Sequence, residues 1–178
     1  MMKKSILIIS LFVFLSLPEL SAQEVASIEH DTDFGHYNSL VQVDADTYVL
    51  AYEGDGNVRS TIATFTISAD GTSITEVASL VHDNTYGRHN SIVQVDADTY
   101  LLAYMGASSD GFIKTFTISS DGATITEVDE LEHDLYSGHY NSLVQVDADT
   151  YVLAYQGWGQ DGFISTFTVS ADGTSITE

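Results

Sequence analysis

The sequence predicts an all-β fold built from three tandem four-stranded antiparallel repeats. Residues 76–126 and 127–177 align without a gap and match at 32 of 51 positions, and residues 24–75 follow the same pattern with one extra residue before Phe65. Runs rich in Val, Ile, Thr, Tyr and Phe are separated by Asp- and Gly-rich turns, and no stretch keeps a helical period with caps. A tandem period of this length made only of short strands indicates that each repeat forms one small sheet.

Each repeat contains four predicted strands in the same order. In the first repeat we predict them at Asn38–Val43, Tyr48–Tyr52, Ile62–Ser68 and Ser73–Asp83. The turn Asp44–Thr47 joins the first two strands, the turn Ala69–Thr72 joins the last two, and a Gly-rich loop joins the second to the third. Short connections of this kind link antiparallel neighbours, so we expect a meander of hairpins.

The segments TYVLAYEG, DGFIKTFTIS and DGTSITEV resemble segments in the blades of secreted bacterial and archaeal β-propeller-type repeat proteins. The resemblance covers the chain from residue 23 onward. It implies propeller-type blades, either as an incomplete ring or as half of an oligomeric ring, because closed propellers have about four to eight blades. A β-trefoil or a β-prism is the alternative for three units that close on themselves.

The fourth strand is predicted to be divided between the two ends of the repeat region. Residues 23–31 match the second half of that strand, residues 173–178 match its first half, and Glu178 falls in the column of Glu24. Self-association of two chains into one ring and a segment of a longer array both fit this division. A strand that stops at its middle favours the second.

The first 22 residues have the pattern of a secretory signal peptide. Two lysines precede an apolar run from Ile6 to Leu17, and the small residues Ser21 and Ala22 follow. The run of 12 residues is shorter than the roughly 20 that span a membrane. We therefore expect no membrane insertion, cleavage near Ala22, a three-repeat domain over residues 23–178, and a secreted, periplasmic or cell-envelope location.

Charge limits the classes of partner. Beyond residue 22, three basic residues stand against 25 acidic ones. A surface this acidic repels nucleic acid and anionic lipid, so neither is an expected partner, whereas a neutral glycan or a protein is. The chain has no cysteine, which excludes disulfides and thiolate metal sites.

The octapeptide VQVDADTY occurs three times, and each copy places two aspartates in its turn. Aspartate bonds to its own backbone in tight turns, which explains these residues without a ligand. The alternative is a calcium site, although two carboxylates in a short turn supply few of the oxygens that calcium needs. The aspartates concerned are Asp44, Asp46, Asp96, Asp98, Asp147 and Asp149. We expect no metal and no other cofactor.

The histidines fall into two groups. His30, His82 and His133 share one column at the end of the fourth strand, and we interpret them as buried side chains bonded to neighbouring Ser, Asp or backbone groups. The others do not keep register, since His36 and His139 align with Arg88 whereas His89 aligns with two tyrosines. A metal site repeated by symmetry would not shift by one column.

One edge of the sheets is predicted to bind a glycan or a protein. In a meander successive turns alternate between edges, so the constant Asp-rich turns share one edge and the variable loops share the other. Loops on a rigid scaffold are where binding residues gather. We predict binding residues at Phe34, His36, Tyr37, Tyr86, Arg88, His89, Tyr136, His139, Tyr140, Trp158 and Asp161. Trp158, flanked by glycines, is the expected anchor.

The sequence thus predicts a non-enzymatic scaffold that binds a glycan or a protein through its variable edge. No Gly-x-Ser-x-Gly elbow and no phosphate loop is present. One alternative is a purely structural envelope or extracellular repeat protein. Another is a glycan-active enzyme, which would need two carboxylates across a cleft. The loop acids available for that role are Asp33, Asp55, Asp110 and Asp161.

Overall fold

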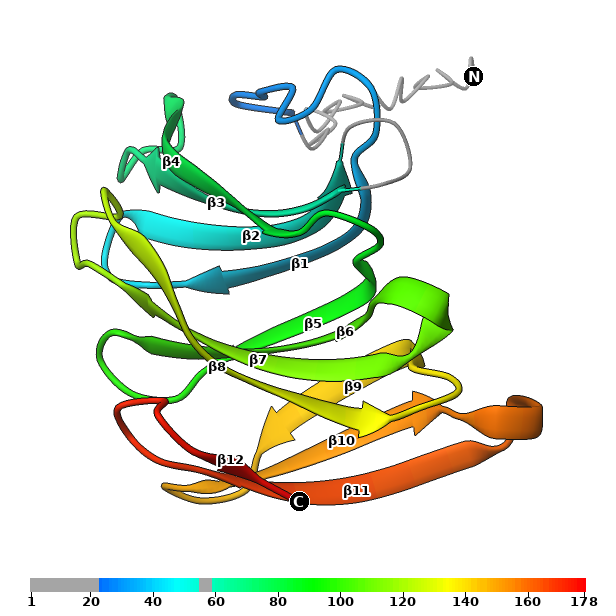
Figure 1. The fold of residues 1–178 in the computed structure, drawn as a ribbon. Helices are drawn as coiled ribbons and strands as arrows, with labels where there is room; N and C mark the ends of the chain where they lie inside the picture. Colours follow the sequence, from blue (N-terminus) through cyan, green and yellow to red (C-terminus); the bar gives the residue numbers. More distant parts are fainter. Residues whose placement is uncertain (1–22, 55–58) are drawn as a thin grey trace, which may run out of the picture.

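Three four-stranded sheets follow one another along the chain in the computed structural model, which describes residues 23–54 and 59–178 (Figure 1). Blade 1 consists of β1 (His36–Gln42), β2 (Thr47–Gly54), β3 (Arg59–Ile67) and β4 (Ile74–Asp83). Blade 2 consists of β5 (Arg88–Gln94), β6 (Thr99–Met105), β7 (Gly111–Ile118) and β8 (Ile125–Asp134). Blade 3 consists of β9 (His139–Gln145), β10 (Thr150–Gln156), β11 (Gly162–Val169) and β12 (Ile176–Thr177). Short 3-10 helices cover Ala107–Ser109 (η1) and Trp158–Gln160 (η2).

Each blade is an antiparallel meander, as predicted. The strands pair in the order β1-β2-β3-β4, and the other two sheets repeat this order. The predicted strands of the first repeat agree with β1–β4 within about three residues at each end. The three sheets are separate and successive, so a β-trefoil or β-prism does not describe them.

The first strands of the blades lie side by side. In Figure 1, β5 lies between β1 and β9, with the Asp-rich turns at one edge of the sheets and the β4–β5 and β8–β9 loops at the other. The predicted division into a constant and a variable edge is therefore confirmed for the described residues.

The core lies between facing blades. One cluster joins Val49 and Ile62 of blade 1 to Leu102 and Phe116 of blade 2, and a second cluster joins blade 2 to blade 3 in the same way. Alternation along each strand sends one set of apolar side chains to the preceding blade and the other set to the following blade. Burial of apolar area between neighbouring blades thus holds each blade against the next.

Three hydrogen bonds are repeated at the two junctions. Between blades 1 and 2 they run from Asn90 Nδ2 to Tyr37 O (3.2 Å), from Ile92 N to Ser39 Oγ (3.0 Å) and from Thr64 Oγ1 to Gly122 O (2.7 Å). Between blades 2 and 3 they run from Asn141 Nδ2 to His89 O (3.1 Å), from Leu143 N to Ser91 Oγ (3.0 Å) and from Thr115 Oγ1 to Gly173 O (2.7 Å).

The N-terminal segment differs from the prediction. Residues 23–35 contain no strand, although 23–31 were predicted as part of a fourth strand. A strand needs a neighbour to pair with, and no described strand forms backbone pairs with this segment. His30 nevertheless packs edge-on against Tyr52 at 4.8 Å between ring centroids. The predicted signal peptide lies outside the described residues, and no helix within those residues is long and apolar enough to cross a membrane.

Candidate functional site

The first strand of each blade (β1, β5 and β9) has a β-bulge near its start. At the bulge one ring departs from the regular alternation of side chains between the two faces of the sheet. The pairing register shifts there in all three blades. The residue at the bulge is Tyr37, His89 or Tyr140, with φ of 53°, 55° and 54°. This left-handed conformation costs a side chain with a bulky ring about 1–3 kcal/mol, and such strain is concentrated at functional sites. The three residues are the ones that share a column in the repeat alignment.

These three residues, which we call the ring row, touch one another across the blades. The ring centroids of Tyr37 and His89 are 4.3 Å apart, and those of His89 and Tyr140 are 4.5 Å apart. His139 stacks on His89 at 5.1 Å. The sequence predicted these residues as loop-edge aromatics, but not that they form one continuous row.

Two adjoining hollows lie beside the ring row. The larger, of about 560 Å³, is lined by Tyr136, His139, Tyr140 and Trp158 together with the polar side chains of Gln156 and Gln160. The smaller, of about 340 Å³, is lined by Tyr86, Arg88 and Met105. Ser108 and Ser109 belong to both, so the hollows meet at that point. A hydrogen bond of 2.9 Å from Gly138 N to Ser109 O ties the neighbouring loops together.

The Trp158 side chain lies at the surface and is not part of the core. It begins η2, where Gly159 adopts a φ of 71°, and a Cβ on Gly157 would come within 2.6 Å of the Phe163 ring. The Trp158 side chain is 70% exposed, and its one described ring contact is with Tyr136, edge-on at 5.6 Å. The two glycines therefore allow the tight turn that holds the indole at the rim of the larger hollow.

An ion pair supports the smaller hollow. Glu53 is buried, and its Oε1 accepts a 2.6 Å hydrogen bond from Arg88 Nε of the next blade. That bond raises the pKa of Arg88 above its usual range. Arg88 also lies over the Tyr86 ring, 5.0 Å from its centroid. The sequence did not point to Glu53, although its column, which contains Met105 and Gln156 in the other blades, could have marked it as unusual.

The imidazole in the middle of the ring row is neutral at physiological pH. Burial, followed by the nearby His139 and Arg88, lowers the pKa of His89 to about 4. A neutral His89 presents an apolar ring face and one N–H donor. The ring row therefore has an uncharged imidazole at its centre.

The other predicted residues lie at the margin of the site. Phe34 packs edge-on against His36 at 5.0 Å, and His36 packs against Tyr37 at 6.1 Å. Asp161 is exposed and lines neither hollow; its backbone closes the η2 turn through a 3.0 Å bond from Gly157 N to Asp161 O. Sequence reasoning missed Ser108, Ser109, Gln156 and Gln160, because single polar residues in loops and at strand ends carry no pattern of their own.

The buried histidines pack but do not bond as predicted. His82 and His133 lie edge-on to Tyr104 and Tyr155, at 4.9 and 4.7 Å. Among the described residues, both ring nitrogens of each lack a hydrogen-bond partner, so the expected bonds to Ser, Asp or backbone are wrong. Burial lowers the pKa of His82 to about 3 and that of His133 to about 4. Aromatic packing, not polar bonding, therefore holds His82 and His133.

The Asp-rich turns bond to themselves. Asp44 Oδ1 accepts from the backbone N–H of Asp46 (3.1 Å) and of Thr47 (2.9 Å), and these bonds lower the pKa of Asp44. Asp147 does the same in the third repeat, at 3.4 and 3.0 Å. Within the described ranges, no three or more His, Asp or Glu side chains are grouped to hold a metal ion.

We expect the second aspartate of each turn to be replaceable. The triple variant Asp46→Asn, Asp98→Asn and Asp149→Asn should lower Tm by less than about 4 °C, because asparagine keeps an acceptor oxygen. Neither this variant nor the unmodified chain should gain Tm in millimolar calcium, as scanning calorimetry can measure. A calcium-dependent rise that the triple change removes would show a binding site, because a ligand of the folded state stabilises it.

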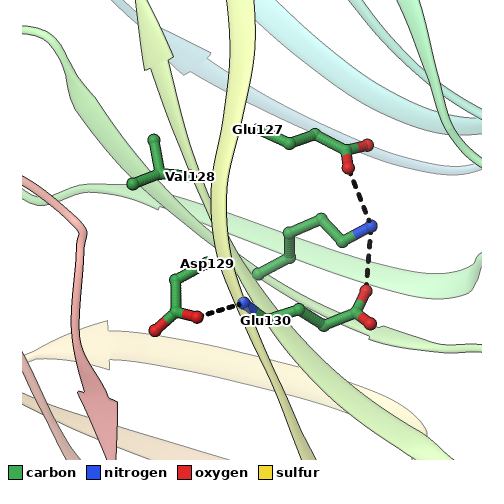
Figure 2. Close-up of a pocket in the computed structure, with 5 residues that line it drawn as sticks. Glu127, Val128, Asp129 and Glu130 are labelled. Carbon is green, nitrogen blue, oxygen red and sulfur yellow. Dashed lines mark hydrogen bonds and ion pairs between the residues drawn. The ribbon is translucent and has the colours of Figure 1, made fainter.

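One charged hollow lies away from the variable edge, on blade 2. Its lining includes Glu127, Val128, Asp129 and Glu130 of β8, drawn in Figure 2. Lys114 Nζ pairs with Glu130 at 2.8 Å and Glu127 at 3.4 Å, and donates to His82 O at 2.8 Å. Since the lysine is satisfied by these three oxygens, the hollow is a structural ion-pair cluster.

No family model and no curated protein matches the chain. Solved structures do match it. A protein from Lactobacillus plantarum matches with a TM-score of 0.59 at 17% identity, over 84% of this chain and 44% of its own. The periplasmic gluconolactonase of Pseudomonas aeruginosa matches with a TM-score of 0.61 at 13% identity, over 82% and 42%. A GH93 α-L-arabinofuranosidase of Fusarium graminearum, solved with arabinobiose, matches with a TM-score of 0.55 at 15% identity, over 83% and 49%. The chain spans less than half the length of each.

Proposed function

We propose that this chain, three blades of a β-propeller, is a secreted, non-enzymatic scaffold that binds a neutral glycan at its variable edge. The observation that carries the proposal is the ring row, three strained residues whose rings touch and lead to the exposed indole of Trp158. Strain of this kind persists where the surrounding structure imposes it, and it is typical of sites where side chains are held ready for a ligand.

The larger hollow has the chemistry of a sugar site. Aromatic faces stack on the C–H faces of pyranose and furanose rings, and amide and hydroxyl groups bond to sugar hydroxyls. Tyr136, Tyr140 and Trp158 supply the faces, and Gln156 and Gln160 supply the amides. The formal net charge of −21 favours a neutral glycan over an acidic one.

Binding without catalysis is supported by the positions of the loop acids. Of the described loop acids, Asp110 and Asp161 line neither hollow, and Asp33 lines a separate hollow with Glu29 and Asp31. Asp55 lies outside the described residues and is not part of this support. Glycoside hydrolysis needs two carboxylates on either side of the scissile bond. Two of the three similar structures described above are carbohydrate-related enzymes by name, and at 13–15% identity that likeness extends to the fold alone.

Trp158 provides a direct test, because it is the single tryptophan of the chain. Neutral gluco-, galacto- and arabino-oligosaccharides should change its fluorescence in a saturable way. Trp158→Ala should weaken glycan retention at least about fivefold, equivalent to about 1 kcal/mol, with Tm unchanged. Trp158→Phe, which keeps a ring, is the matched control and should retain most of the affinity.

Other results would contradict the proposal. No fluorescence change and no retention across the glycan panel would favour the purely structural role. Release of reducing sugar from the same oligosaccharides would favour the enzyme. Retained binding in Trp158→Ala with a lowered Tm would mean that the indole is part of the core.

A further inference from the structure

The two end faces of the chain expose positions that are buried inside it. Ile164 of blade 3 is 77% exposed, whereas Ile62 and Ile113, at the same position in blades 1 and 2, are 0% exposed. Leu40 of blade 1 is 59% exposed, whereas Ile92 and Leu143 are 6% and 5% exposed. Each of these buried side chains packs between two blades. The outer faces of blades 1 and 3 are therefore the two halves of one more junction.

The remaining features of these faces also match. On blade 1, Leu50, Tyr52, Ala63 and Phe65 form a small core cluster that is already buried in the single chain. Blade 3 has an open hollow of about 500 Å³ lined by Tyr140, Ser142, Ala154, Tyr155, Phe163 and Ile164, among others. A Cβ on Gly71 would meet nothing within 4 Å, whereas one on Gly122 or Gly173 would press on the threonines of the neighbouring blade.

The hydrogen-bonding groups of a third junction are also present. At each existing junction, one blade contributes a backbone carbonyl, a serine hydroxyl and a threonine hydroxyl. The next blade contributes, in the same order, the asparagine amide, the backbone N–H and the glycine carbonyl that bond to them. Blade 3 offers the first set through Tyr140, Ser142 and Thr166. Blade 1 offers the second set through Asn38, Leu40 and Gly71. In the described structure these groups make no such bond between blades.

Blade 3 also has an open strand edge. β3 and β7 pair along their lengths with a fourth strand, whereas β11 pairs with β12 only at Thr168 and Val169. On that side, residues 162–167 pair with no described strand, and their sequence, GFISTF, contains no charge. An uncharged open edge is a template for strand addition.

The N-terminal segment has the sequence of the outer strand that would pair with this edge. Residues 24–31, EVASIEHD, repeat the EVASLVHD of β4 and the EVDELEHD of β8. The contact of His30 with Tyr52, at 4.8 Å, also repeats the contacts of His82 with Tyr104 and His133 with Tyr155. His30 thus already occupies the place where the outer strand of a preceding blade ends.

We propose that two copies of this chain join through both end faces into one six-bladed ring, with residues 24–31 of each copy forming the outer strand along residues 162–167 of the other. Blade 3 of one copy packs on blade 1 of its partner, and two-fold symmetry makes the two new junctions identical, so the assembly closes. The span of 42–49% of the matched propellers fits a half ring.

The register of the added strand follows from the repeats. Ile62 pairs with Leu80 and Ile113 pairs with Leu131, so Ile164 pairs with Ile28 of the second copy. Opposed residues in antiparallel strands lie about 4.5–5.5 Å apart, within the range of a disulfide. The chain has no native cysteine, so any disulfide reports the introduced pair.

Mixing the full-length variants Ile28→Cys and Ile164→Cys under mild oxidation tests the contact. Both sites are exposed in the single chain, so both variants should fold. We expect a covalent heterodimer in high yield, and sedimentation of the unmodified chain should give a dimer that Ile164→Asp converts to a monomer. The control mixes Glu29→Cys with Ile164→Cys, because the neighbouring side chain points to the opposite face of the strand.

Three results would overturn the proposal. They are a monomer of the unmodified chain at micromolar concentration, no heterodimer from the mixture, or an equal yield from the Glu29→Cys control. A monomer would mean that the end faces are covered by something other than a second copy. None of these results depends on glycan binding by the variable edge.

Discussion

Lowering the pH from 7 should begin to destabilise the fold near pH 6, above the range in which most carboxylates protonate. His82 and His133 have pKa values of about 3 and 4 in the folded chain, mainly because of burial, and the pKa of the partly buried His89 is lowered in the same direction. In the unfolded chain a histidine titrates near 6.5. Between these values the unfolded state binds more protons than the folded state, so stability is complete above about pH 6.5 and falls as the pH drops.

The expected slope is about 1.4 kcal/mol per pH unit for each such histidine between pH 6 and 4.5. Urea unfolding at pH 7, 6, 5 and 4.5 measures it. His82→Leu, which keeps an apolar group in a site where the ring has no described hydrogen-bond partner, should flatten the dependence while changing stability at pH 7 much less. The comparison variant is His36→Gln, which removes an exposed histidine.

A slope unchanged in His82→Leu would contradict the assignment. It would mean that the buried ring is protonated in the folded chain and that acid unfolding begins at the carboxylates. Asp70, whose pKa is lowered to about 2 by bonds from Thr72 and Ser68, contributes stability that is lost only below about pH 4. The two sources of acid sensitivity are therefore separated along the pH axis.

Arg88→Met should cost about 3–5 kcal/mol of unfolding free energy, because it leaves the Glu53 carboxylate buried without its main partner. His36, whose Nδ1 lies 3.9 Å from Glu53, is mostly exposed and replaces little of the lost interaction. Chemical denaturation at pH 7 gives the difference directly.

The double variant Glu53→Met and Arg88→Met should recover most of that loss. Blade 2 has a methionine, Met105, at the position that Glu53 occupies in blade 1, so we expect a methionine to fit at position 53. A double-mutant cycle separates the ion pair from the change in shape. If Arg88→Met alone cost less than about 1 kcal/mol, Glu53 would have to be reached by water in solution.

The strands and the two edges could be predicted because they depend on local chemistry. Alternation such as Thr64, Phe65, Thr66, Ile67 marks a half-buried strand, and Asp-Gly turns mark its ends. The column shared by Tyr37, His89 and Tyr140 was also readable from the repeat alignment. At these positions the local sequence preference agrees with the overall fold, so the sequence alone is enough to predict them.

The bulges and the buried charge could not be read in the same way. A left-handed φ is expected at Gly or Asn, and nothing in the sequence indicates it at Tyr37 or His89. Glutamate is almost always exposed, and the partner that allows Glu53 to be buried is 35 residues away on another blade. The wrong hydrogen bonds assigned to His82 have the same origin, since its neighbours are aromatic rings brought in by packing.

The junction bond from asparagine to the ring row has an evolutionary consequence. Asn90 and Asn141 hold the bulges through the carbonyl oxygens of Tyr37 and His89, so the attachment does not depend on which side chain the bulge carries. Blade 1 already has a tyrosine there and blade 2 a histidine, with the same φ. A substitution at this position can therefore change the ring at the variable edge without removing the bond that joins the blades, and duplicated copies are free to diverge one ring at a time.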